Sequence, residues 1–389
     1  MKSPANKFTF IEKELEERNS RNHLRSLQTV VPTSAVEATV NGRPMINFSS
    51  NDYLGLSGHY LLKQRATEFM ERYGTGSTAS RLICGTYECF DHVEQKLAEL
   101  KGAESALLLS SGFQANVSIL PALTDRHSLI LSDRLNHRSL VEGSLLSRCR
   151  VVRFRHNALD HLQQLLNENR DKGHSRTLIV TESVFSVDGD QSDIDALVEI
   201  ASDFEALLII DEAHATGVLG DRGMGLTCNK KVDLTIGTFG KALGSFGSYV
   251  TCSEQMRTYF INCCAGFIYT TALPPSVVGA IDAALDLIPT MENERLDLHQ
   301  KAEQVRSSLS ELGWSTGEST TQIIPVIVGD EIQTLALSKW LEDQGILAVA
   351  IRPPTVETGQ SRIRLAISAL HTDDHIEQLI NAFRKWHEK

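Results

Sequence analysis

Lys241 is the residue of this sequence with the most specific chemical potential. It lies in the glycine-rich stretch TFGKALGSFG (238–247), just after the apolar run Leu234–Ile236. A lone lysine in such a loop is most often a solvated surface charge. A lysine at an active site, however, can form a Schiff base with an aldehyde cofactor. A cofactor of the pyridine type then needs a carboxylate at its ring nitrogen, a flat side chain against its face and donors for its phosphate.

Asp211 and His214 follow another apolar run, Leu207–Ile210, and could serve the ring of such a cofactor. An opposite charge at about 4 Å is worth about 4 kcal/mol at an effective dielectric constant of about 20. That energy equals about three pKa units, which is enough to keep a ring nitrogen protonated beside Asp211. His214, three residues further on, could reach a phenolic oxygen of the same ring.

Two further segments could supply the stacking ring and the phosphate site. His137 follows the loop SDRLN (132–136) and offers a flat imidazole. Ser111, Gly112 and Phe113 open an expected helix after an expected strand, and the first amides of a helix suit a phosphate. None of these residues is specific alone, because a lone histidine is more often structural. Their convergence at strand ends favours a cofactor site.

Two motifs suggest other chemistry but lack the context that it needs. YGTGSTA (73–79) matches G-x-G-x-x-G/A, yet a charged helical stretch precedes it where a dinucleotide fingerprint needs a strand, and SRLICGT, which we expect not to be helical, follows. We expect this loop to approach a ligand or a neighbouring subunit closely. Asp211-Glu212-Ala213-His214 matches the acidic box of helicases. The phosphate loop that a helicase requires is missing, since TIGTFGKA (235–242) has Thr in place of the first Gly and Ala in place of the hydroxyl residue.

Alternating strand and helix patterns predict a mostly parallel sheet between helical layers through the middle of the chain. The expected strands are Ala106–Leu109, Ser128–Leu131, Val151–Phe154, Thr177–Thr181, Leu207–Ile210, Leu234–Ile236 and Ser248–Thr251. The expected helices are Cys89–Leu100, Gln114–Leu123, Leu159–Asn167 and Ile194–Asp203. In such sheets the site lies outside the carboxyl ends of the strands, where the cofactor candidates above are found.

The pattern changes after about residue 275, where longer helices and fewer strands predict a smaller α+β domain. Its expected elements are helices Ser276–Ile288, Leu296–Leu312 and Ile332–Gln344, strands Ile323–Val328, Leu347–Ile351 and Arg362–Ile367, and a final helix. We therefore expect three parts: an N-terminal segment (1–50) with a polar helix over 8–28, a large α/β domain (51–275) that binds the cofactor, and a small C-terminal domain (276–389).

Composition excludes several classes of protein. Lys plus Arg number 38 against 49 for Asp plus Glu, so the formal net charge is −11, and without a basic run nucleic-acid binding is disfavoured. The seven cysteines form no Cys-x-x-Cys pair, which argues against a zinc or redox site, and we expect no metal. The polar N-terminus is unlike a signal peptide, and no long uncharged apolar stretch occurs. We expect a cytoplasmic protein without a membrane partner.

The chain resembles the α-oxoamine synthases, pyridoxal-phosphate enzymes of the aspartate aminotransferase fold type, from about residue 10 to residue 385. The segments that carry the resemblance are SNDYLGLSGH (50–59), GTGSTASRLICGT (74–86), LSSGFQANVSIL (109–120), DRLNHRSLVEG (133–143), ESVFSVDGDQSDI (182–194), IIDEAHATGVLGDRGMG (209–225) and TFGKALGSFG (238–247). The segment IRPPTVETGQSRIRLAISALH (351–371) is most similar to the branch that uses L-alanine.

This resemblance implies a fold, a cofactor and a reaction. The fold is that of PLP-dependent transferases of fold type I, with a mostly parallel seven-stranded sheet between helices and a smaller C-terminal α+β domain. The implied cofactor is pyridoxal 5'-phosphate (PLP). The implied reaction is the decarboxylative condensation of L-alanine with pimeloyl-CoA or pimeloyl-acyl carrier protein in biotin biosynthesis. A homodimer in which both subunits build each site is also implied.

The resemblance further implies roles for single residues. Lys241 would hold the cofactor and later move the substrate proton, Asp211 would pair with the ring nitrogen, His137 would stack on the ring, and His214 would bind the phenolic oxygen. Further implied cofactor contacts are Gly112, Phe113, Ser186 and Thr238, with Thr270 and Thr271 reaching the phosphate of a partner subunit. The implied substrate contacts are Arg25, Thr355 and Arg364, the last for the amino-acid carboxylate. Arg364 has an alternative as a solvated or paired surface residue.

Four positions depart from the usual pattern of the family. Thr78-Ala79 replaces a Gly-Gly pair, Ser183 stands where Gly is frequent, and Glu357 stands where Pro is frequent. None of them is one of the four groups at the cofactor ring, so we expect an active enzyme, and these positions bear on acyl-chain fit and affinity instead. Within the family, the alternative is a glycine C-acetyltransferase that makes 2-amino-3-ketobutyrate. A catalytically silent homologue is disfavoured because Lys241 is present.

Overall fold

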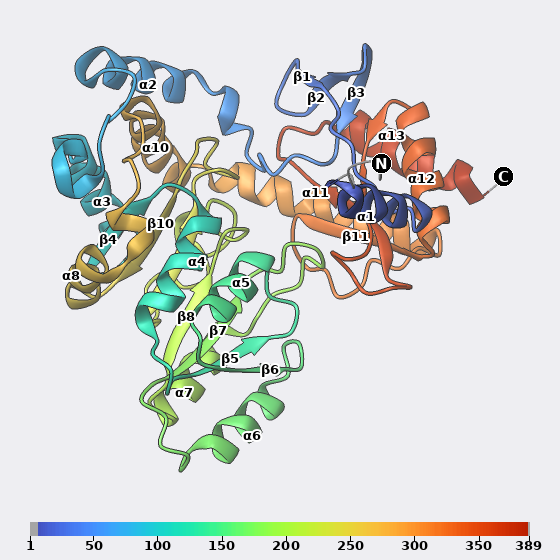
Figure 1. The fold of residues 1–389 in the computed structure, drawn as a ribbon. Helices are drawn as coiled ribbons and strands as arrows, with labels where there is room; N and C mark the ends of the chain where they lie inside the picture. Colours follow the sequence, from blue (N-terminus) through green and yellow to red (C-terminus); the bar gives the residue numbers. More distant parts are fainter. Residues whose placement is uncertain (1–6, 388–389) are drawn as a thin grey trace, which may run out of the picture.

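A seven-stranded sheet forms the centre of the large domain in the computed structural model, which describes residues 7–387 (Figure 1). Its spatial order is β4-β10-β9-β8-β7-β5-β6. The strands are β4 (Ser105–Leu109), β5 (Leu129–Asp133), β6 (Arg150–Phe154), β7 (Thr177–Glu182), β8 (Leu207–Asp211), β9 (Leu234–Thr238) and β10 (Ser248–Cys252). Only β10 is antiparallel to its neighbours in this sheet. The predicted mostly parallel sheet is confirmed, and each expected strand ends within two residues of the observed bounds.

Helices cover both faces of this sheet because its strands are apolar on both sides. Ile130 of β5 packs into one buried cluster with α4 and α8, whereas Leu129 and Leu131 pack into another with α6 and α7. Alternate residues of one strand thus enter opposite layers, as strand geometry requires. The covering helices are α3 (Glu88–Lys101), α4 (Gly112–Leu123), α5 (Arg138–Leu146), α6 (Leu159–Asn169), α7 (Ile194–Asp203), α8 (Glu254–Cys263) and α9 (Ala265–Ile268).

A long helix, α11 (Glu292–Glu311), leads from the large domain into the smaller C-terminal one (Figure 1). Before it, α10 (Pro275–Leu287) packs beside α2 (Tyr60–Tyr73). The smaller domain contains an antiparallel sheet of β11 (Ile323–Gly329), β14 (Ser361–Ala366) and β13 (Val349–Ile351). Helices α12 (Glu331–Asp343) and α13 (Asp373–His387) accompany it. The predicted α+β composition of this region is confirmed.

The N-terminal segment differs from its prediction. Helix α1 spans Thr9–Ser20 rather than 8–28, because Asn22 takes a left-handed conformation (φ 57°) and the amide of His23 bonds the carbonyl of Arg18 at 2.8 Å. This is a Schellman termination. The first six residues of the segment lie outside the described residues.

Three strands that were not predicted follow this helix: β1 (Val30–Pro32), β2 (Glu37–Val40) and β3 (Arg43–Asn47). Asn41-Gly42, both at positive φ, form the two-residue turn between β2 and β3, a hairpin signal that the sequence carried. The strand expected over 347–351 is divided at Ala348, and its first part, β12 (Ile346–Leu347), pairs in parallel with β3. The N-terminal segment therefore shares a sheet with the C-terminal region, and the boundary at residue 50 stays a prediction.

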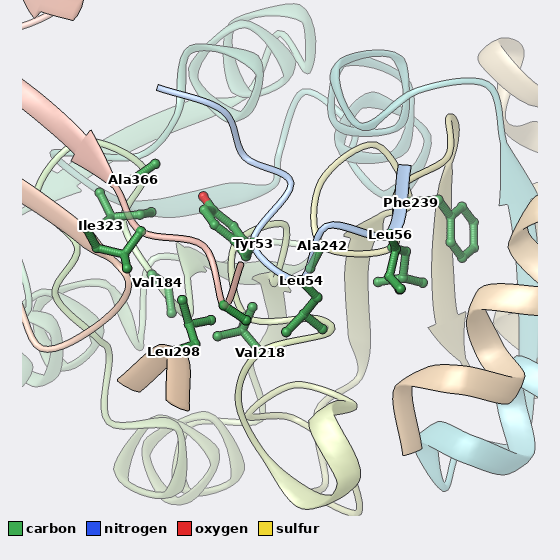
Figure 2. Packing of buried hydrophobic residues seen from close by; sticks show 14 of the residues in the cluster. Tyr53, Leu54, Leu56, Val184, Val218, Phe239, Ala242, Leu298, Ile323 and Ala366 are labelled. Atoms are coloured by element: carbon green, nitrogen blue, oxygen red, sulfur yellow. The ribbon is translucent and has the colours of Figure 1, made fainter. Parts of the chain in front are cut away.

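One buried cluster joins the two domains next to the predicted site (Figure 2). Tyr53 and Ala242 of the large domain belong to the same cluster as Ile323 and Ala366 of the smaller domain. The β11–β14 sheet is thereby fixed against the segment that carries Tyr53. None of the helices in the described part of the chain is long and apolar enough to cross a membrane.

Candidate active site

The predicted cofactor residues gather at one edge of the central sheet. Asp211 is the last residue of β8 and Thr238 the last of β9, while His214 and Lys241 each follow three residues later. Since β8 and β9 are parallel neighbours, their carboxyl ends lie side by side. The short distance along the chain from each strand end is what brings Lys241 and His214 together.

The Lys241 amine contacts the imidazole of His214, with Nζ 2.7 Å from Nε2. The other ring nitrogen of His214 lies 2.7 Å from the Tyr53 hydroxyl. Burial and the positive charge of Lys241 hold the pKa of His214 well below its ordinary value, so the imidazole is neutral at neutral pH. Burial lowers the pKa of Lys241 to about 8, although Asp211 and Glu182 act in the opposite direction. A sizeable fraction of the amine is therefore a free nucleophile near neutral pH.

Asp211 is a buried carboxylate held in one orientation. Its Oδ2 accepts from the side-chain amide of Asn116 at 2.7 Å, and its Oδ1 accepts from the backbone amide of Ala213 at 2.9 Å. The same Asn116 amide donates to the Ser139 hydroxyl at 2.9 Å, which in turn lies 2.7 Å from Nδ1 of His137. Through this network, the orientation of the His137 ring depends on the orientation of the Asp211 carboxylate.

Glu182, the last residue of β7, is a second buried carboxyl beside Asp211. Burial, reinforced by the negative charge of Asp211, raises the pKa of Glu182 well above its ordinary value. Burial and Asp211 thus favour the protonated form of Glu182, which accepts a hydrogen bond from the backbone amide of His137.

Helix α4 begins at Gly112 with unused donors. The hydroxyl of Ser111 accepts from the amide of Gln114 at 3.2 Å, whereas the amides of Gly112 and Phe113 have no acceptor within the described residues. A Cβ added at Gly112 would meet nothing within 4 Å, so the space before this helix end is open. Thr270 lies beside the same turn, because its hydroxyl accepts from the side chain of Gln114. These donors suit a phosphate group.

Thr238 and Thr271 each hold a segment of backbone close to the site. The Thr238 hydroxyl donates to the carbonyl of Gly247 at 2.9 Å and accepts from the amide of Gly240 at 3.1 Å, which shapes the turn before Lys241. Thr271 pairs with Ser80 in an isolated bridge, next to the YGTGSTA loop. That loop follows helix α2 and leads into one turn of π-helix (Arg81–Gly85), contrary to the expectation that this stretch is not helical. A helix rather than a strand still precedes it, so the dinucleotide interpretation remains excluded.

The loop after β7 brings Ser186 to the smaller domain. The Ser186 carbonyl accepts from Nε of Arg364 at 2.6 Å, and another nitrogen of Arg364 donates to Oδ1 of Asn51 at 3.1 Å. Arg364 is partly buried and, in the described part of the chain, has no carboxylate partner. The surface-residue alternative therefore fits less well than a guanidinium that is free to bind a substrate carboxylate.

His156 connects the loop after β7 with strand β5 through two carboxylates. Its two ring nitrogens lie 3.0 Å from Asp133 and 2.8 Å from Asp190. Burial opposes its charge, but these two carboxylates outweigh burial and raise the pKa of His156 to about 10. A protonated imidazole thus bridges the ends of β5 and of the loop that carries Ser186.

Arg25 and Thr355 meet each other away from Lys241. Nη2 of Arg25 donates to the Thr355 hydroxyl at 2.9 Å, and both residues line a groove of about 740 Å³ between residues 19–28 and 335–355. Neither bonds to Lys241, Asp211 or His214 among the residues that the structure describes. Their predicted substrate contacts therefore remain untested.

The residues present fit a pyridine aldehyde phosphate. The site offers an amine with a depressed pKa, a buried carboxylate held by two donors, and a helix end with two unused amides. In the described residues, no group of three or more His, Cys, Asp or Glu side chains could hold a metal ion.

Several residues of this site escaped the sequence analysis. Tyr53 and Asn51 lie in SNDYLGLSGH, a segment that was singled out without a role for either side chain. Asn116 and Glu182 lie in singled-out segments as well. Gln322 had no signal, yet its buried amide donates to the backbone carbonyl of His214 at 2.9 Å. The position of Glu182 at a strand end, like that of Asp211, was the one pattern that could have revealed it.

Comparison with known proteins agrees with this geometry. Residues 43–383 match the family described as aminotransferase class I and II. A protein of Desulfosudis oleivorans, provisionally named 8-amino-7-oxononanoate synthase, is 56% identical over 98% of this chain and 99% of its own length. The 8-amino-7-oxononanoate synthase of Gluconacetobacter diazotrophicus is 48% identical over 96% of each chain. The solved serine palmitoyltransferase of Sphingomonas wittichii has a TM-score of 0.92 and 27% identity, covering 99% of this chain and 98% of its own.

The matches extend over nearly the whole chain, and solved structures of the same fold contain PLP. Lys241, Asp211 and the α4 helix end lie within the matched residues. The chain therefore belongs to the PLP-dependent class I and II aminotransferase family, in the group whose members are named 8-amino-7-oxononanoate synthase.

Proposed function

We propose that this protein catalyses the decarboxylative condensation of L-alanine with a pimeloyl thioester to 8-amino-7-oxononanoate, a step of biotin biosynthesis. The single observation that carries the proposal is the meeting of Lys241, His214 and Asp211 at the sheet edge, with Arg364 reaching the same site from the smaller domain. The relatives at 48–56% identity that carry this enzyme name support the substrate assignment.

The chain supplies most of what the reaction needs besides the cofactor. When bound, PLP provides an electron sink for negative charge at the amino-acid α-carbon. Lys241 binds the cofactor covalently and moves a proton at that carbon, for which a pKa of about 8 is suited. Asp211 keeps the ring nitrogen protonated, and Gly112 and Phe113 bind the phosphate. Arg364 binds the carboxylate of the amino acid before it leaves as carbon dioxide.

We also propose a homodimer with shared sites. Phe113 at the phosphate-binding helix end is an apolar side chain that is exposed in the single chain, as are Leu82, Ile83, Phe246 and Tyr269. A partner covering them would enclose the site and exclude water. We propose that Thr270 and Thr271 reach the partner's phosphate in such a dimer. Sedimentation at micromolar concentration should give twice the mass of the chain, and a monomeric mass would contradict the dimer.

A cytosolic location is part of the proposal. All seven cysteines are unpaired, including the buried Cys89, Cys228, Cys252 and Cys264. Unpaired thiols are usual in reducing compartments. The acyl group is carried by coenzyme A or by acyl carrier protein, and both carriers present the same thioester to the site.

The function is tested by supplying purified protein, loaded with PLP, with L-alanine and pimeloyl-CoA. Mass spectrometry should detect 8-amino-7-oxononanoate and free coenzyme A in equal amounts. Glycine with acetyl-CoA is the matched competing pair, and a faster reaction with it would replace the proposal by glycine C-acetyltransferase. L-serine with palmitoyl-CoA provides the corresponding control for the serine palmitoyltransferase fold neighbour.

A further inference from the structure

A chain of hydrogen bonds links Lys241 to the smaller domain through Tyr53. The Lys241 amine lies 2.7 Å from Nε2 of His214, and Nδ1 of the same ring lies 2.7 Å from the Tyr53 hydroxyl. That hydroxyl lies 3.0 Å from Oδ1 of Asn51, which also accepts from Arg364 at 3.1 Å. All four contacts have hydrogen-bond distances. Tyr53 and His214 are 0% and 4% exposed, so water does not replace these partners.

Lys241 and Tyr53, the two hydrogen-bond partners of the His214 ring, decide which ring nitrogen carries the proton. The depressed pKa keeps the ring neutral, and a neutral imidazole has one donor and one acceptor nitrogen. Which of the two nitrogens carries the proton is set by the hydrogen bond that the other nitrogen makes. Burial raises the pKa of Tyr53, so the phenol keeps its single proton at neutral pH.

Two acceptors bonded to the Tyr53 hydroxyl compete for that single proton, Oδ1 of Asn51 and Nδ1 of His214. Arg364 has only donors, so the Asn51 atom that faces it must be the oxygen, and Tyr53 can donate to this oxygen. The Tyr53 oxygen then accepts Nδ1–H of His214, which leaves Nε2 as an acceptor for a protonated amine. Alternatively, Tyr53 donates to Nδ1. In that arrangement Nε2 carries the proton and faces a neutral amine.

We propose that Tyr53 is a positioning residue for Lys241, and that the Tyr53 hydroxyl turns between Asn51 and His214. This turn lets Nε2 of His214 accept from the protonated amine and donate to the neutral one. The change releases one proton in total: an ammonium proton of Lys241 ends on Nε2, and the Nδ1 proton leaves to solvent. Tyr53 thus allows one neutral imidazole to accompany both protonation states of the lysine. The proposal rests on the proposed function only in that Lys241 binds the cofactor.

Replacement of Tyr53 by phenylalanine isolates this role, because the ring packing is kept and only the hydroxyl is lost. Nδ1 of His214 would then have no partner. A buried donor without an acceptor is rarer in proteins than a buried acceptor without a donor, so the ring should place its proton on Nε2. This proton points at Lys241 and disfavours the ammonium. The other ionisable groups that face the amine, Asp211, Glu182 and Arg364, stay in place.

The test measures how fast the apoprotein takes up PLP as a function of pH, followed by the absorbance of the bound cofactor. Only the neutral amine attacks the aldehyde, so the midpoint reports the pKa of Lys241. The wild-type rate should rise through a pH of about 8. Tyr53→Phe should move the midpoint down by about one pH unit, which is the scale of one buried hydrogen bond. Comparison with the wild type cancels the ionisation of free PLP.

A matched control and a second variant separate this role from a general loss of stability. Tyr249→Phe removes an equally buried hydroxyl that bonds Thr216 at 2.7 Å instead of the imidazole, and its midpoint should equal the wild-type value. Asn51→Leu keeps the Tyr53 hydroxyl but removes its competing acceptor, so Tyr53 donates to Nδ1. The midpoint should again fall.

A double-mutant cycle with His214→Phe shows whether the effect passes through the imidazole. In this background Tyr53→Phe should produce no further shift. An unchanged midpoint in Tyr53→Phe, or the same shift without His214, would overturn the proposal. Failure of the wild type to take up PLP would instead contradict the proposed function, so the two results can be told apart.

Discussion

Replacing Lys241 by alanine should abolish both covalent cofactor binding and turnover. The amine is the attacking group toward the aldehyde and the base at the substrate carbon, and no other lysine reaches His214 among the described residues. Loss of a positioned base alone lowers rates by up to a factor on the order of 10⁴. We therefore expect product formation to fall by at least that factor. Product is measured by mass spectrometry under saturating alanine and pimeloyl-CoA.

Borohydride reduction followed by intact-mass measurement gives an independent readout of this variant. The wild type should gain the mass of reduced PLP, and Lys241→Ala should not. Lys231→Ala is the control, because Lys231 is exposed and lies outside the site. It should behave as the wild type in both measurements. Covalent attachment in Lys241→Ala would show that another lysine holds the cofactor.

Lys101→Met should cause the largest loss of stability that we expect from a single substitution. The Lys101 ammonium donates to Glu212 and to the carbonyl of Met224, and the two side chains of the ion pair are 1% and 0% exposed. Burial opposes the charge of Lys101, but Glu212 and Tyr249 together outweigh burial and raise its pKa. Methionine would leave the Glu212 charge buried without its counterion. Such losses cost about 3–5 kcal/mol, which urea unfolding can measure.

Two comparisons make this prediction specific. Lys230→Met removes a lysine that pairs with Asp195, which is 76% exposed, and should cost less than about 1 kcal/mol. The double variant Lys101→Met/Glu212→Leu removes both buried charges and should recover part of the lost stability. If the double variant is less stable than Lys101→Met alone, the uncompensated charge is not the cause. Glu212 also accepts from the amide and hydroxyl of Thr227. The double variant loses these two hydrogen bonds, so its recovery of stability should be incomplete.

The sequence by itself determined the central sheet and the four groups at its edge. Each buried strand is a short apolar run, and the hydrophobic effect acts on such a run wherever it lies in the chain. Asp211 and Lys241 could be placed because Asp211 ends β8 and Lys241 follows β9 by three residues, a local relation that parallel topology turns into proximity. The resemblance to a known family added the cofactor and the reaction.

The N-terminal strands were missed although part of their signal was local. Asn41-Gly42 predicts a hairpin, but the flanking strands are short and β1 is wholly exposed. The pairing of β3 with β12 joins segments about 300 residues apart in the sequence, and no local pattern specifies it. A two-residue strand such as β12 is stable only because tertiary packing holds it beside β3.

Only the tertiary structure decided how the groups around Lys241 are coupled. Tyr53 meets His214 from 161 positions away, and Asn51 meets Arg364 from 313 positions away. Sequence spacing carries no information on such contacts, because they depend on how the smaller domain packs against the large one. The depressed pKa of Lys241 and the raised pKa of Glu182 arise from burial, which also exists only in the folded chain. The residue types thus came from the sequence, whereas their protonation states came from the fold.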